Sequence, residues 1–212
     1  MCQLNCIEVF SSAPDTAERA RYINEHAPDC SCEGQIVSPH CADPIGPGEI
    51  LIRAVVDDTH IVREDGSVRL RSSFMSDAVF FGASCMRHCR ATKEELRLTA
   101  EEILRNATLK EDGTPKTIIG YVLLSVNAIK SARITQAQKV SNQPATQVSA
   151  DAFGIYATGL IDRPNHSDIF INDCSNGVKF TRSAQNRSVR DLSDKSSLVE
   201  ITALSDFVAL GV

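Results

Sequence analysis

Short apolar runs and helical stripes alternate along the chain and are separated by turn residues. Residues 49–56 are almost all apolar, as in a strand that is buried on both faces, and Arg53 is the exception. A second extended segment, residues 67–74, follows an acidic turn and a turn that contains glycine. We therefore expect residues 49–56 and 67–74 to form a central strand pair around which the rest of the chain is built.

Two segments show the spacing of amphipathic helices. Residues 93–107 carry one apolar stripe and begin after Thr92, which lies three positions before Glu95. This spacing predicts a capping box, in which the hydroxyl and the carboxylate bind each other's backbone amides. Residues 14–26 are predicted to form a shorter amphipathic helix that ends before Pro28.

Further strands complete the predicted domain. Apolar and β-branched residues predict strands at residues 4–10, 117–126, 152–158, 169–172 and 197–204. Phe80 and Phe81 are expected in the core, and residues 207–212 are apolar enough to dock on the rest of the chain. No Gly/Ser-rich or Pro-rich linker interrupts the sequence. We therefore predict that residues 1–212 form a single α+β domain, with a mixed or antiparallel sheet and two or three helices.

The composition is that of an ordinary globular protein, with 42% hydrophobic and 23% charged residues. The formal net charge of -5 gives no general attraction to nucleic acid or to anionic lipid, so nucleic acid is not an expected partner. The basic residues Arg182, Arg187 and Arg190 are interrupted by Asp191 and Asp194, which is typical of a solvated polar segment.

The apolar runs also bear on the membrane. None of them approaches the roughly 18 residues that are needed to span a bilayer, and the N-terminus lacks a signal-peptide pattern. We therefore expect a cytoplasmic protein with no membrane partner.

Eight cysteines in such a compartment are expected to be mainly reduced thiols or metal ligands. The long connection at residues 28–48 contains Cys30, Cys32, His40 and Cys41. Thiolate and imidazole are ligands that zinc prefers, so this Cys/His-rich loop is predicted to hold a structural zinc. A second interpretation is a loop with reduced, partly exposed thiols, because the spacing includes no CxxC pair. Cys2 and Cys6 could also replace one pair of ligands.

A second Cys/His cluster contains Cys85, His88 and Cys89. In a helix these three positions would share one face. They would then suit three metal ligands, or a thiol activated by the imidazole and by a neighbouring arginine. The alternative is that the cysteines are buried as small apolar residues.

Arg53 and the serine pair at residues 72–73 suggest an anion clamp, because a guanidinium binds phosphate or carboxylate through two parallel hydrogen bonds. The structural alternative is an ion pair, since an unpaired buried charge is costly. Nearby carboxylates that could pair with the arginine are Asp57, Asp58 and Glu49.

His166 follows a proline turn and lies two residues before Asp168. A histidine oriented by a carboxylate can act as a general base, although a histidine in this position also commonly caps a turn. Arg53, Ser73 and His166 are therefore the candidate catalytic residues.

Several short motifs resemble those of a loosely defined set of uncharacterised bacterial proteins. They are an LxR strand at Leu51 and Arg53, a DG turn at residues 65–66, the Ser-Ser-Phe segment at residues 72–74, a valine-rich strand at residues 122–126, and a Pro-x-His-x-Asp-Ile element at residues 164–169. The resemblance implies a bacterial cytoplasmic protein and no established activity. The arginine and serine elements are also similar to those of ADP-ribosyltransferases, which hold NAD, although the acidic ExE or QxE element of that family is absent.

The sequence contains no phosphate-cradling glycine loop, no G-x-S-x-G elbow and no HExxH motif. We therefore expect a binding or accessory protein of a larger assembly, with a protein partner and a structural zinc. The alternative is an enzyme that acts on a nucleotide or other small anionic ligand through Arg53, Ser73 and His166, or one with a Cys/His nucleophile at Cys85.

Overall fold

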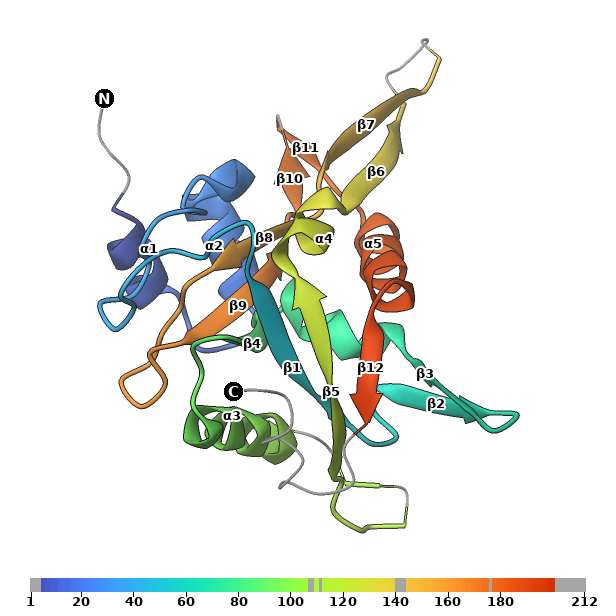
Figure 1. Ribbon diagram of the computed structural model, residues 1–212. Helices are drawn as coiled ribbons and strands as arrows, with labels where there is room; N and C mark the ends of the chain where they lie inside the picture. Colours follow the sequence, from blue (N-terminus) through green and yellow to red (C-terminus); the bar gives the residue numbers. More distant parts are fainter. Residues whose placement is uncertain (1–4, 107–108, 111, 140–143, 176, 201–212) are drawn as a thin grey trace.

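The structure is a computed structural model that describes residues 5–106, 109–110, 112–139, 144–175 and 177–200 (Figure 1). Its centre is an antiparallel sheet with the strand order β12–β5–β1–β4–β9–β8. The bounds of these strands are, in that order, Ser197–Glu200, Ile118–Ser125, Ile50–Val56, Ala83–Arg87, His166–Ile171 and Phe153–Tyr156. The predicted α+β class with an antiparallel sheet is confirmed.

Five α-helices lie in the described residues, against the two or three predicted. They are α1 (Cys6–Ser12), α2 (Arg19–His26), α3 (Lys93–Asn106), α4 (Val126–Ser131) and α5 (Arg182–Asp194). Two segments form 3-10 helices, η1 (Pro28–Cys30) and η2 (Ser72–Val79). No helix was assigned from the sequence to the segments of α1, α4 and α5. The helices α1 and α4 are seven and six residues long, so neither is long enough to show a helical stripe in the sequence.

β1 is central because its side chains are buried on both sides of the sheet. Every residue of the strand after Ile50 is buried, and β1 pairs with β5 along one edge and with β4 along the other. The predicted pairing with residues 67–74 is wrong. β3 (Ser67–Leu70) pairs instead with β2 (Ile61–Glu64), through a tight turn in which Asp65 and Gly66 both have positive φ. Such a turn favours pairing between the strands that it joins.

Two further hairpins lie outside the main sheet. β6 (Arg133–Gln138) pairs with β7 (Thr146–Asp151), and β10 (Cys174–Ser175) pairs with β11 (Val178–Lys179). The β6–β7 and β2–β3 hairpins both project from the body of the molecule (Figure 1).

Helices cover both faces of the main sheet. On one face, η2 and α5 pack over a core that includes Leu51, Val55 and Val122. On the other face, α3 covers Ile52 and Met86. The helices α1 and α2 lie beside β8 and β9 and form a separate apolar cluster with side chains of those strands (Figure 1).

The predicted helix at residues 93–107 is confirmed as α3. The Thr92 amide donates to Glu95 Oε2 at 2.7 Å, and the Glu95 amide donates to Thr92 Oγ1 at 3.2 Å, so both hydrogen bonds of the capping box are present. The predicted helix at residues 14–26 begins later, at Arg19. The polar segment that contains Arg182, Arg187 and Arg190 is also helical, because one side of α5 buries Ala184, Val189 and Leu192 while the other stays polar.

The strand predicted at residues 4–10 is wrong where the structure describes it, because Cys6–Ser12 is α1. Asn5 caps this helix by accepting a hydrogen bond from the Glu8 amide at 3.3 Å. The strand predicted at residues 197–204 is present as β12 up to Glu200, and its remainder lies outside the described residues, as does the segment 207–212. Within the described ranges, no helix combines the length and the apolar character needed to cross a membrane.

Candidate functional site

The guanidinium of Arg53 is fully buried and bonded to the fold on three sides. Its Nε donates to the carbonyl oxygen of Phe74 at 3.0 Å, and its Nη1 donates to that of Ser84 at 2.6 Å. Its Nη2 binds the carboxylate of Asp77 at 2.6 Å. The ion-pair partner is thus Asp77, and not one of the three carboxylates near Arg53 in the sequence. Arg53 ties η2 to the sheet.

Ser73 lies on η2, close in sequence to the carbonyl that Arg53 binds. Its hydroxyl donates to the carbonyl oxygen of Thr59 and therefore holds η2 to the turn after β1. The Ser73 hydroxyl is thus engaged with the backbone, as the Arg53 guanidinium is.

His166 belongs to a buried chain of hydrogen bonds at the start of β9. The hydroxyl of Thr158 donates to Asp168 Oδ2 at 2.9 Å and lies 3.1 Å from His166 Nδ1. Because this hydroxyl has a single proton, it accepts from Nδ1–H of His166, which leaves Nε2 as the proton-accepting atom. The hydroxyl of Ser84 completes the chain by donating to Asp168 Oδ1 at 3.3 Å. His166 is oriented as a general base would be, but only 4% of its surface is exposed.

The three candidate catalytic residues do not come together. Met86 pairs with Ile52 on one side and with His166 on the other, so these three side chains share a face of the sheet. Arg53 directly follows Ile52 in β1, and successive side chains of a strand point to opposite faces. Arg53 and Ser73 therefore lie on one side of the sheet and His166 on the other.

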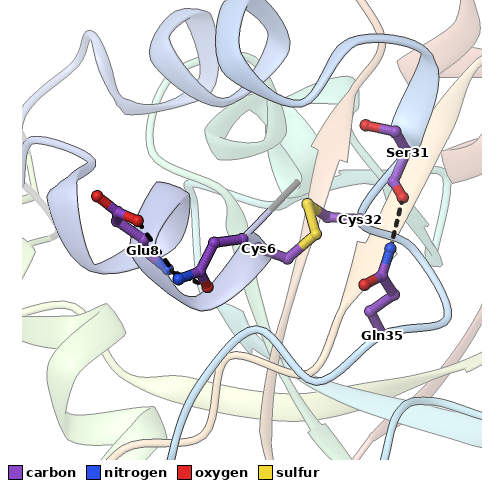
Figure 2. The surroundings of a disulfide bond; sticks show 6 residues. Cys6, Glu8, Ser31, Cys32 and Gln35 are labelled. Carbon is purple, nitrogen blue, oxygen red and sulfur yellow. Dashed lines mark hydrogen bonds between the residues drawn. A yellow bond between two sulfur atoms is a disulfide. The ribbon is translucent and has the colours of Figure 1, made fainter. Parts of the chain in front are cut away.

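The Cys/His-rich loop is tied to α1 by a disulfide between Cys6 and Cys32 (Figure 2). Figure 2 also shows the side-chain amide of Gln35, whose Nε2 donates to the carbonyl oxygen of Ser31 and so orders the loop beside the disulfide; this distance is 3.0 Å. Cys32 was a predicted zinc ligand and Cys6 a possible replacement, but both sulfur atoms are bonded to each other in the disulfide and do not bind a metal in this form.

The other predicted zinc ligands lie at separate places. Cys30 lies against Gly154 and Tyr156, and burial raises the pKa of its thiol to about 11. Cys41 accepts from the Gly159 amide at 2.9 Å and donates to the carbonyl oxygen of Ala157 at 3.1 Å. The side chain of His40 is exposed. Among the described residues, no group of three or more His, Cys, Asp or Glu side chains is arranged to hold a metal ion.

The second Cys/His cluster is not helical, because its first residue lies in β4 and the others follow the end of that strand. Cys85 is fully buried, and burial raises the pKa of its thiol to about 12. Cys89 is exposed, with its sulfur 3.6 Å from Nδ1 of the neighbouring His88. Cys85 therefore has the surroundings of a core residue, and only Cys89 of this cluster faces solvent as a thiol.

A network around Arg87 was not predicted. Arg87 is 2% exposed and binds both carboxylate oxygens of Glu49, at 2.7 and 2.5 Å. It also binds Asp43 Oδ1 at 2.9 Å. These bonds fasten the end of the Cys/His-rich loop to β4. No local sequence signal links the three residues, since Asp43 and Arg87 are far apart in the chain.

Phe80 and Phe81 form an aromatic patch on the surface, which corrects their predicted place in the core. They are 38% and 46% exposed, and their ring centroids lie 6.3 Å apart. The amides of Phe80, Phe81 and Gly82 all donate to the carbonyl oxygen of Asp77, at 2.9, 2.8 and 2.9 Å. The patch is thus held on an ordered turn.

Comparison of the chain with protein-family models, with curated proteins and with solved structures finds no match.

Proposed function

We propose that this protein works by binding a protein partner, as an accessory component of a larger assembly, and that the aromatic patch of Phe80 and Phe81 is its contact. The observation that supports this proposal is the exposure of two adjacent phenylalanine rings on a turn held by three backbone hydrogen bonds. Rings that are already ordered lose little conformational entropy on binding, so more of their burial energy contributes to affinity.

Gly82, which directly follows the patch, also holds the turn in place. Its φ is +97°, and a Cβ at this position would lie 2.6 Å from a ring atom of Phe170. The backbone therefore passes against the core here and can do so only as glycine. This close packing limits the freedom of the neighbouring Phe81, as expected of a residue that anchors an interface.

The partner should offer an apolar socket for Phe81. Burial of one phenylalanine side chain contributes about 1.5–3 kcal/mol, and aromatic anchors of this kind commonly dominate interfaces. The matched control is Ile161, which is 85% exposed on another loop. If exposed apolar area alone were responsible, substitution of Ile161 would matter at least as much.

The test compares wild-type protein, Phe81→Ala and Ile161→Ala as bait in extracts of the source cells, followed by measurement of affinity for the purified partner. We expect the wild type and Ile161→Ala to bind a defined partner with the same Kd, and Phe81→Ala to bind at least about tenfold more weakly. Equal binding by all three, or a monomer with robust turnover of a small substrate, would overturn the proposal. Sedimentation of the purified protein shows whether the chain binds a second copy of itself, and so distinguishes self-association from binding of a different partner.

The alternative function, an enzyme acting on a nucleotide or other anionic substrate, would require Arg53 to exchange its present bonds for a ligand. Its test is calorimetric titration with NAD. Binding that is lost in a folded Arg53→Ala variant would favour the enzyme, whereas loss of folding in that variant favours a structural arginine. An enzyme that used His166 Nε2 as its base would need a separate site, because His166 lies on the opposite side of the sheet from Arg53.

We also propose a structural zinc, at Cys30, Cys32, His40 and Cys41, in a form of the protein in which Cys32 is released from Cys6. Elemental analysis of protein purified with and without reductant tests this, and zinc should appear only in the reduced sample. A bacterial, cytoplasmic origin is proposed from the resemblance in sequence and from the five cysteines that are free in the described residues. The disulfide is unusual for that compartment, so thiol counting on protein trapped in cells is the direct check.

A further inference from the structure

A cavity of about 260 Å³ lies between α2, the start of α5, β11 and the end of β9. It does not include Phe81 or any of the residues that were predicted as catalytic or metal-binding. One part of its wall is apolar and contains Val79, Ile171 and Phe180. Its volume is slightly below the usual range for small-molecule sites, about 300–1,000 Å³, so it suits a small ligand.

The charged part of the wall contains three cations and one carboxylate. Arg21 is compensated, because it lies 2.7 Å from Glu18 and 3.6 Å from Glu25. Lys179 and Arg182 also line the cavity, and neither forms an ion pair with any carboxylate that the structure describes. Two positive charges thus remain available to a ligand.

Arg182 is positioned by its surroundings. Its guanidinium carbon lies 4.2 Å from the centroid of the Phe80 ring, and its Nη1 donates to Gln185 Oε1 at 3.4 Å. Stacking on an aromatic ring holds the planar group in place without using its N–H donors. Several donors therefore remain for a carboxylate.

Asp173 supplies the negative charge of the wall. Burial raises the pKa of its carboxyl, Lys179 and Arg21 oppose this rise, and Glu25 adds to it. The amide of Asp173 donates to Asn24 Oδ1 at 3.2 Å, which fixes the residue against α2. With Asp173 ionised, the three cations of the wall face three carboxylates, namely Asp173 and the two that pair with Arg21, so these six charges sum to zero. Asp173 repels a phosphate dianion more strongly than a singly charged anion, so the wall favours the singly charged ligand.

We propose that this cavity binds a small organic monocarboxylate, whose carboxylate contacts Lys179 and Arg182 and whose short apolar body lies against Val79 and Ile171. Phe81, whose substitution tests the aromatic patch, lies outside the cavity, whereas the Phe80 ring of the patch stacks on Arg182. The two proposals are tested by different variants, so the failure of one is distinguishable from the failure of the other.

The test uses 4-methylpentanoate and benzoate as probes and inorganic phosphate as the doubly charged comparison, with binding measured by ligand-observed NMR and calorimetry. Lys179→Met and Arg182→Met remove the proposed contacts, and Arg187→Met is the matched control on α5, because Arg187 does not line this cavity. We expect the carboxylates to bind with a Kd of about 1 mM or below, the two cavity variants to bind at least about tenfold more weakly, and the control to bind like the wild type.

Asp173→Asn gives a separate readout. Substitution by asparagine removes the charge that repels the ligand, so Asp173→Asn should bind both carboxylates more tightly than the wild type at pH 7, where the probes are fully ionised. Three results would overturn the proposal. They are phosphate binding as tight as carboxylate binding, a loss of carboxylate affinity in Arg187→Met equal to that in the cavity variants, and no binding of either carboxylate at about 10 mM.

Discussion

Replacement of Arg53 by methionine tests whether this residue serves the fold. Methionine retains an apolar side chain of similar reach and removes the guanidinium, so the carbonyl oxygens of Phe74 and Ser84 lose their side-chain donor. An acceptor that becomes unsatisfied in the interior costs about 1–3 kcal/mol. The lost ion pair with Asp77 adds little to this cost, because the Asp77 side chain is 44% exposed and water can solvate the released carboxylate. We therefore expect a loss of about 2–6 kcal/mol in the free energy of unfolding.

The measurement is urea unfolding followed by far-UV circular dichroism, with the free energy taken by linear extrapolation. A protein of ordinary stability, about 5–15 kcal/mol, would be strongly weakened by this loss, and Arg53→Met could fail to fold. Asp77→Asn is the milder companion variant, since it retains an oxygen for Nη2 while removing the charge, and it should lose less than Arg53→Met. A folded Arg53→Met protein within about 1 kcal/mol of the wild type would refute the reasoning, because the buried donors would then contribute nothing measurable.

Three further predictions concern local features. Thr92→Ala should lower the free energy of unfolding by about 1 kcal/mol through loss of the α3 cap, measured by the same urea titration, and an unchanged midpoint would contradict this. Burial, with Arg53 and Lys116, lowers the pKa of His60 from 6.5 to about 3. Stability should therefore be fully present above about pH 6.5 and fall as the unfolded chain takes up a proton below it, and His60→Gln should flatten this slope between about pH 5 and 6.5. Without reductant, Cys6→Ser should lower the free energy of unfolding by about 2–4 kcal/mol, because the disulfide is lost; with reductant, it should have no effect. Cys89→Ser should leave the melting temperature unchanged in both conditions.

Local signals account for the parts of the fold that were predicted. Thr92 and Glu95 are three residues apart, so the start of α3 can be read from the sequence without knowledge of the rest of the chain. β1 and β5 were found for a similar reason, since strands buried on both sides are continuous apolar runs. α1 was mistaken for a strand because its residues are compatible with both structures. The Asn5 side chain caps the segment and stabilises the helix.

The missed features depend on contacts between distant parts of the chain. Arg53 needs a partner, as the sequence indicates, but the choice of Asp77 over the closer carboxylates is made by the position of η2. The pairing of Arg87 with Asp43, and that of Cys6 with Cys32, likewise depends on how distant segments are placed by the fold. Phe80 and Phe81 look like core residues because hydrophobicity does not report which side of a turn faces solvent.

The position of β12 has a consequence for synthesis on the ribosome. β12 pairs with β5 and forms one edge of the sheet, although the two strands are separated by most of the C-terminal half of the chain. While the intervening residues are being translated, β5 presents unpaired amides and carbonyls to any other nascent chain nearby. Arrest of translation before residue 197 should therefore yield a product that aggregates through β5, and chaperone binding during synthesis should be strongest in this interval.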